Sequence, residues 1–183
     1  MWTLLPIDEG RENAVGKTKR LVISAILVAL GTALGIAENM LQLGAGIFPG
    51  GKLGLANIVT LAALYLFGGG TALSVAVVRA ILTCAATGMS SLPFSLSGAV
   101  LSAAAMWAAK QYLPCSEVGV SMIGACMHNL AGVTVSALLL SNPYLYTYFP
   151  ILLLFSLISG ILTGGVAQLA LRRLESVRNE RGS

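Results

Sequence analysis

Charged side chains are scarce in this sequence. They make up 10% of its 183 residues, while 56% of the residues are hydrophobic. Soluble chains carry about 25% charged residues, and the mean hydropathy of +0.85 is far above the range of such chains. This composition excludes an ordinary soluble domain and predicts a domain within a lipid bilayer, and the length allows one such domain.

The motifs of several enzyme classes are also missing. No G-x-x-x-x-G-K-[ST] loop is present, which excludes an ATPase in this chain, and no H-E-x-x-H motif or paired Cys/His metal set occurs. The single aspartate, Asp8, lies near the N-terminus and leaves no credible Ser-His-acid arrangement. The three cysteines are odd in number and form no C-x-x-C pair, and two of them lie in apolar runs, which favours small buried hydrophobes over a disulfide or metal framework. We therefore expect no enzyme activity and no cofactor or metal.

What the sequence does contain is a series of apolar segments. A helix that crosses about 30 Å of hydrocarbon needs roughly 20 residues. The second segment has only fifteen, so it can cross only if residues 47–51 dip into the membrane ahead of it. We predict an all-α integral membrane protein with a six-helix bundle over residues 20–173, an N-terminal arm (1–19) and a basic tail (174–183). The predicted spans are Leu21–Ala37, Leu53–Phe67, Thr71–Thr87, Pro93–Ala109, Val118–Leu140 and Phe149–Leu171.

The distribution of basic residues predicts the orientation of these spans. With six spans, nine of the basic residues fall on one side and only Lys52 on the other. Because Lys and Arg accumulate in cytoplasmic segments, both termini should be cytoplasmic, in a multi-pass protein of the plasma membrane. The net charge of +4 is then a sign of topology rather than of nucleic-acid binding. The nine residues are Arg11, Lys17, Lys19, Arg20, Lys110, Arg172, Arg173, Arg178 and Arg181.

Polar residues in the middle of spans are candidates for function. Arg79 lies near mid-depth of the third span, where arginine costs about 2.5–3.5 kcal/mol and must face protein or water. His128 and Asn129 lie midway along the fifth, and His128 is on a face of small and polar residues. Each residue either lines a ligand cavity or has a structural role in packing. No Asp or Glu lies within a predicted span, which argues against proton-coupled transport.

The segment between the first two spans is the second candidate region. It is apolar and rich in glycine, it has Glu38 and Lys52 near its ends, and it leads into Asn57. Together with Asn39, these residues could belong to a lid that closes over a site from outside. The alternative is a plain interfacial connector with a Glu38–Lys52 pair.

Small residues form close-packing faces on two spans. Ala25, Ala29 and Ala33 recur every four residues in the first span, and the last span carries Gly160-x-x-x-Gly164. Small-xxx-small faces let helices approach closely in lipid. Such faces can pack within the chain or against an outside partner, and the sequence leaves both possibilities open.

The run P-G-G-K-L-G-L-A-N-I-V-T at 49–60, with Glu38 and with Gly124-x-x-x-His128-Asn129, resembles the Gx transporter family, also labelled heptaprenyl diphosphate synthase component I. The resemblance extends from about Lys19 to Arg173. It implies kinship with the S components of energy-coupling-factor transporters. These are six-helix proteins that bind a vitamin-like solute near the outer side and dock through an Ala-x-x-x-Ala face of helix 1. Gly132 stands where family members often have glutamine, so the solute or its pose is expected to differ.

The resemblance thus implies the solute-binding component of an importer, with a transmembrane coupling subunit and two ATPase subunits as partners. The alternatives are a stand-alone secondary carrier and an accessory membrane subunit in polyprenyl diphosphate, quinone or flavin-linked redox assembly. A prenyl synthase itself is disfavoured, because such enzymes hold magnesium with Asp-rich clusters. The expected solute-binding residues are Asn57, Arg79, His128 and Asn129, with Glu38, Asn39 and Lys52 as the gate, and Ala25, Ala29 and Ala33 as the docking face.

Overall fold

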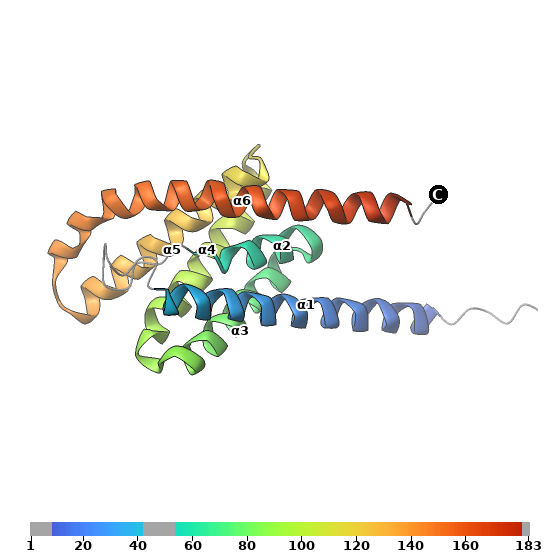
Figure 1. The fold of residues 1–183 in the computed structure, drawn as a ribbon, viewed down its shortest axis with the longest axis horizontal. Helices are drawn as coiled ribbons and strands as arrows, with labels where there is room; N and C mark the ends of the chain where they lie inside the picture. Colours follow the sequence, from blue (N-terminus) through green and yellow to red (C-terminus); the bar gives the residue numbers. More distant parts are fainter. Residues whose placement is uncertain (1–8, 42–53, 181–183) are drawn as a thin grey trace, which may run out of the picture.

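The structure is a computed structural model that describes residues 9–41 and 54–180, with the side chains of 16–41 and 54–173. These residues form helices only (Figure 1). Two short 3-10 helices, η1 (Met89–Ser91) and η2 (Pro143–Tyr148), precede the fourth and sixth α-helices. The α-helices are α1 (Glu9–Met40), α2 (Asn57–Phe67), α3 (Gly69–Thr87), α4 (Leu92–Tyr112), α5 (Glu117–Leu139) and α6 (Phe149–Glu180).

Five helical segments are long and apolar enough to cross a bilayer. They coincide with five of the predicted spans, so the predicted all-α membrane bundle is confirmed. The terminal helices are longer than predicted. Helix α1 begins at Glu9, inside the predicted arm, and α6 continues to Glu180, inside the predicted tail. Residues 9–19 and 174–180 therefore extend helices of the bundle.

Helix α2 differs from the predicted second span. It has 11 residues, which at 1.5 Å per residue cover about 16 Å, roughly half of the hydrocarbon thickness. It begins at Asn57 and not at Leu53, because Gly54 has a φ of +76° and cannot continue a right-handed helix. The amide of Asn57 donates to the Gly54 carbonyl over 2.8 Å and closes the turn. Residues 47–51, predicted to dip into the membrane, lie outside the described residues.

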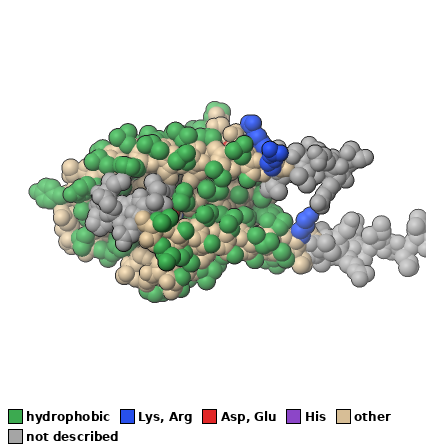
Figure 2. Space-filling model, viewed as in Figure 1, with side chains coloured by type: hydrophobic (Ala, Val, Ile, Leu, Met, Phe, Trp, Pro, Cys, Tyr) green, Lys and Arg blue, Asp and Glu red, His purple; other side chains and the backbone are tan. Residues whose placement is uncertain are grey.

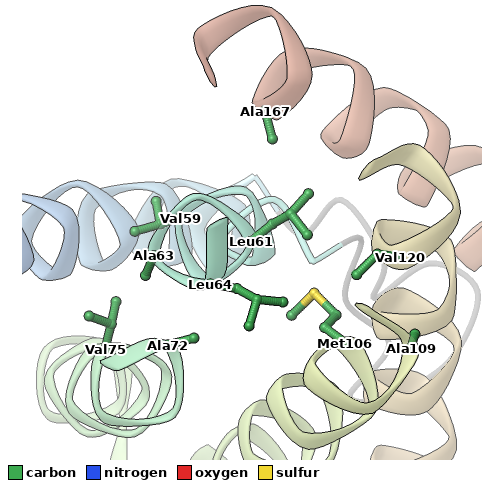
Figure 3. Packing of buried hydrophobic residues seen from close by; sticks show 10 residues of the cluster. All are labelled: Val59, Leu61, Ala63, Leu64, Ala72, Val75, Met106, Ala109, Val120 and Ala167. Atoms are coloured by element: carbon green, nitrogen blue, oxygen red, sulfur yellow. The ribbon is translucent and has the colours of Figure 1, made fainter. Parts of the chain in front are cut away.

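Short as it is, α2 occupies the centre of the bundle. It contacts all five other α-helices. Helices α1, α3, α4, α5 and α6 follow one another as neighbours around it, and α2 fills the space between α1 and α6, which do not touch each other (Figure 1). Figure 3 shows the resulting core. Four α2 side chains meet residues from α3 to α6; the cluster is Val59, Leu61, Ala63, Leu64, Ala72, Val75, Met106, Ala109, Val120 and Ala167.

The two long terminal helices define one end of the bundle. Helix α1 starts and α6 finishes beyond the other helices at the same end (Figure 1). Lysine and arginine side chains gather there, whereas the rest of the visible face is largely hydrophobic (Figure 2). We call this the basic end and define it by Lys17, Arg20, Arg172 and Arg173; the opposite end is the far end. Termini on one side agree with the predicted topology.

The two small-residue faces, on α1 and α6, differ in how they pack. A Cβ atom on Gly160 would lie 2.5 Å from the Met122 Cα, and one on Gly164 would lie 2.7 Å from the Val118 Cα. Helix α6 therefore uses its Gly-x-x-x-Gly face to pack directly on the backbone of α5. The alanine ladder of α1, in contrast, is exposed at Ala25, Ala29 and Ala33. The described helices therefore leave this face of α1 largely uncovered.

Candidate functional site

The Arg79 guanidinium is buried between α2 and α3. Its Nε donates to Thr60 Oγ1 over 3.2 Å, and its Nη2 donates to Asn57 Oδ1 over 2.8 Å. Asn57 and Thr60 are three residues apart and so lie on one face of α2. Gly31 of α1 makes room for the side chain, because a Cβ there would lie 3.0 Å from Arg79 Cδ. Arg79 therefore faces protein, as its cost in lipid requires.

The Glu38 carboxylate reaches the start of α2 from α1. Its Oε1 accepts a hydrogen bond from the Gly54 amide over 2.7 Å, and its Oε2 accepts one from the Leu55 amide over 3.2 Å. A carboxylate is stabilised at this position by the amides and by the positive end of the helix dipole. Glu38 lies inside the apolar Gly16–Met40 segment and is buried. The expectation that no acidic residue lies within a span was therefore wrong: the helix continues past Ala37 because backbone amides satisfy the carboxylate.

Both charged side chains line one small cavity. Its free volume is about 20 Å³, enough for about one water molecule. It lies toward the far end, since Glu38 is near the end of α1 and Ser95 is near the start of α4. Five helices contribute to its wall, and α6 does not. The lining residues are Gly35, Glu38, Gly54, Ala56, Asn57, Arg79, Ala80, Thr83, Ser95 and His128.

His128 reaches the wall of this cavity from α5, so Arg79 and His128 line the same space. The imidazole ring lies directly against Gly98 of α4. A Cβ on Gly98 would be 2.7 Å from the ring Cε1. A glycine at this position is therefore what lets the ring pack between α4 and α5.

Two polar groups of the cavity wall have no hydrogen-bond partner among the described residues. They are Asn57 Nδ2 and Thr83 Oγ1, on side chains that are only 2% and 5% exposed. An unsatisfied buried polar group costs about 1–3 kcal/mol, and most such groups in proteins have a partner. The cavity thus presents a donor and a hydroxyl that a water molecule or a polar ligand would satisfy.

The structure places the remaining predicted site residues elsewhere. Asn129 turns toward α6, where its Nδ2 donates to Ser156 Oγ over 2.7 Å in a buried contact. Asn39 donates to Thr87 Oγ1 over 3.2 Å at the far end and does not line the cavity. Lys52 lies outside the described residues. Arg79, His128, Asn57 and Glu38 are therefore brought together, and Asn39 and Asn129 are not.

Sequence reasoning missed three polar residues of the site. Thr83 follows Arg79 by four residues and Thr60 follows Asn57 by three, so helical spacing alone placed each on the face of a predicted site residue. Ser95 carries no such signal, because its place in the wall depends on how α4 packs. No group of three or more His, Cys, Asp or Glu side chains that could hold a metal ion occurs among the residues that the structure describes.

The fold and the site define a polytopic α-helical membrane protein with a charged cavity buried between its helices. Residues 27–170 match the family described as heptaprenyl diphosphate synthase component I, and the chain belongs to this family. The matched range includes every residue that lines the cavity. No curated protein and no solved structure matches the chain.

Proposed function

We propose that this protein is the solute-binding membrane component of an importer of the energy-coupling-factor type, for a small vitamin-like or cofactor-precursor solute. The observation that carries the proposal is the buried cavity in which Glu38, Arg79 and His128 meet two unsatisfied polar groups. Ionisable residues within membrane spans are costly and are functional by default. Buried polar groups with a purely structural role usually have a partner, whereas Asn57 Nδ2 and Thr83 Oγ1 have none among the described residues.

The chemistry of the cavity favours a solute with an anionic or carbonyl-rich group. The Arg79 guanidinium and the Asn57 amide nitrogen supply donors for a carboxylate or carbonyl oxygen. Glu38 and the Thr83 hydroxyl supply acceptors for an amine, imide or hydroxyl on the same solute. A charge-assisted hydrogen bond to Arg79 in this low-dielectric setting contributes more than a neutral one.

The cavity in its present form is too small for such a solute. Small-molecule sites have volumes of about 300–1,000 Å³, against about 20 Å³ here. The described state is therefore closed, and solute binding requires the helices around the cavity to part. Opening at the far end breaks the two hydrogen bonds between Glu38 and the start of α2. Transport then needs only different solute affinities in the outward-facing and inward-facing states.

Three features support the orientation, the partner ATPases and the docking face in this proposal. The cations at the basic end favour a cytoplasmic location of that end, which directs the cavity toward the outside of a plasma membrane. The sequence has no phosphate-binding loop, so ATP hydrolysis falls to partner ATPases. Helix α1 is the least packed span, with 17% of its apolar window buried against 33–39% for the others. Its exposed Ala25, Ala29 and Ala33 offer a close-packing face to a transmembrane coupling subunit.

A stand-alone secondary carrier is the second candidate function. It is favoured by one specific observation, the presence of Glu38 and His128 in the wall of the same cavity. A carboxylate and an imidazole at membrane depth are the groups that proton relays use. The family description names a prenyl synthase component, but with Asp8 as its single aspartate this chain could serve such an enzyme only as an accessory subunit.

Co-purification separates these functions. The tagged full-length chain is extracted from its native membrane in mild detergent, and bound proteins are identified by mass spectrometry. Recovery of two ATPases and a membrane coupling subunit is expected. Ala29→Trp should abolish their recovery, whereas Ala104→Trp, the same change at an exposed position of α4, should not. If the chain is recovered alone and exchanges solute in a pH-dependent manner in vesicles, the protein is a secondary carrier and not an importer component. Recovery with a prenyl synthase would favour the role of an accessory subunit.

A further inference from the structure

A second hollow lies between α1 and α3, at the basic end of the bundle. These two helices pack side by side (Figure 1). The groove has a volume of about 640 Å³ and shares no lining residue with the far-end cavity. We call it the basic groove. It is lined by Lys17, Arg20, Leu21, Ser24, Ala25, Val28, Gly70, Thr71, Ser74, Val75 and Val78.

The side chains that line the groove are cationic and polar at one end and apolar deeper along it. Lys17, Arg20 and Thr71 lie at the basic end, whereas Val28 and Val78 lie deeper along the two parallel helices. From residue 17 to residue 28 an α-helix advances about 16 Å, about half the hydrocarbon thickness. Cations at one end and apolar walls over this depth match an amphiphile whose anionic group lies at the membrane surface and whose chain points to the bilayer centre.

The cationic end of the groove is preorganised. The Arg20 Nη2 donates to the Phe67 carbonyl over 3.0 Å and to the Thr71 hydroxyl, and the guanidinium lies 5.7 Å from the centre of the Phe67 ring. A guanidinium has five N–H donors, so these bonds through Nη2 fix the group and leave Nε and Nη1 for a phosphate. Lys17, three residues earlier, lies on the same face of α1.

We propose that the basic groove binds an anionic glycerophospholipid, with its phosphate between Lys17 and Arg20 and one acyl chain between α1 and α3. Basic pockets between helices at the cytoplasmic surface are suited to anionic lipid headgroups. A helix of a partner protein fits less well, because it would have to place an acidic side chain at the surface and an apolar ridge below it. This inference does not depend on the solute, and the groove shares only Ala25 with the proposed docking face of α1.

The test uses the full-length chain in nanodiscs of phosphatidylcholine alone or mixed with phosphatidylglycerol, and lipids retained after gentle release are counted by native mass spectrometry. The wild-type chain should retain phosphatidylglycerol in preference to phosphatidylcholine. Loss of one lysine near anionic lipid weakens binding about fivefold, as about 1 kcal/mol implies. Lys17→Ala should therefore retain about fivefold less phosphatidylglycerol. Lys19→Ala removes the same charge outside the groove and should change nothing.

A second pair of variants tests the apolar part. Val78→Trp fills the deep end of the groove and should reduce phosphatidylglycerol retention, whereas Leu73→Trp on an exposed face of α3 outside the groove should not. Equal retention of the two lipids, or equal effects within either variant pair, would overturn the proposal. So would displacement of the lipid by inorganic phosphate, which would indicate a headgroup site without a chain, or preferential retention of an added prenyl diphosphate.

Discussion

Replacement of Arg79 by leucine separates a binding role from a structural one. The substitution removes two hydrogen bonds from a charged donor to Thr60 and Asn57, worth about 1.5–3 kcal/mol each. It also removes the desolvation cost of the buried guanidinium, so the two effects partly offset each other. Because Asn57 Oδ1 then loses its partner, Arg79→Leu should lower the free energy of unfolding by about 1–3 kcal/mol. Glu38 keeps its two backbone amide donors and is not left without hydrogen bonds.

Solute binding should weaken strongly while the chain still folds. A lost charge-assisted bond of about 1.5–3 kcal/mol weakens binding by about 10- to 150-fold. Thermal unfolding followed by circular dichroism in mild detergent measures the first effect, and uptake or binding of the solute measures the second. Arg172→Leu, the same substitution at an exposed position of the basic end, is the matched control. A variant that fails to fold, or one that binds solute like the wild type, would refute the assignment of Arg79 to the solute site.

Three further predictions follow from the packing and the topology. Gly160→Ala should lower the free energy of unfolding by about 1–3 kcal/mol, since its Cβ would meet the Met122 backbone. Gly132→Ala, with open space around it, should not lower this free energy. Equal unfolding midpoints for the two variants would contradict the α5–α6 contact. Glu38→Gln should speed hydrogen exchange at the two backbone amides that its side chain binds, because a neutral amide accepts more weakly; unchanged exchange would show that this contact does not hold the far end closed. Cys115, exposed in the α4–α5 connection, should react with a membrane-impermeant maleimide in inverted vesicles but not in intact cells, and the opposite pattern would reverse the assigned orientation.

The long spans could be predicted from the sequence because their signal is local. An apolar run of sufficient length has to be a helix in lipid, where each backbone amide needs a partner. The start of α2 could not be predicted in the same way. It depends on the positive φ of Gly54 and on Glu38, which binds the amides of Gly54 and Leu55 from another helix. Such a tertiary contact leaves no periodic pattern in the sequence.

The candidate site was predictable in part for a similar reason. Arg79 and His128 stood out because polar side chains at mid-depth must face the interior, and both line one cavity. His128 and Asn129 were predicted together, but successive helical residues point about 100° apart, and Asn129 faces α6 instead. Glu38 was predicted at the site as part of a gate, yet its burial within α1 depends on the position of α2, which the sequence did not reveal.

Native mass spectrometry of the gently extracted protein shows whether the cavity around Arg79 and His128 holds a small polar solute. We expect a small-molecule adduct on the wild-type chain and on the groove variant Lys17→Ala, and its loss from Arg79→Leu. An adduct that persists in Arg79→Leu, or a wild-type chain that carries no small molecule after exposure to its growth medium, would rule out a solute site at Arg79.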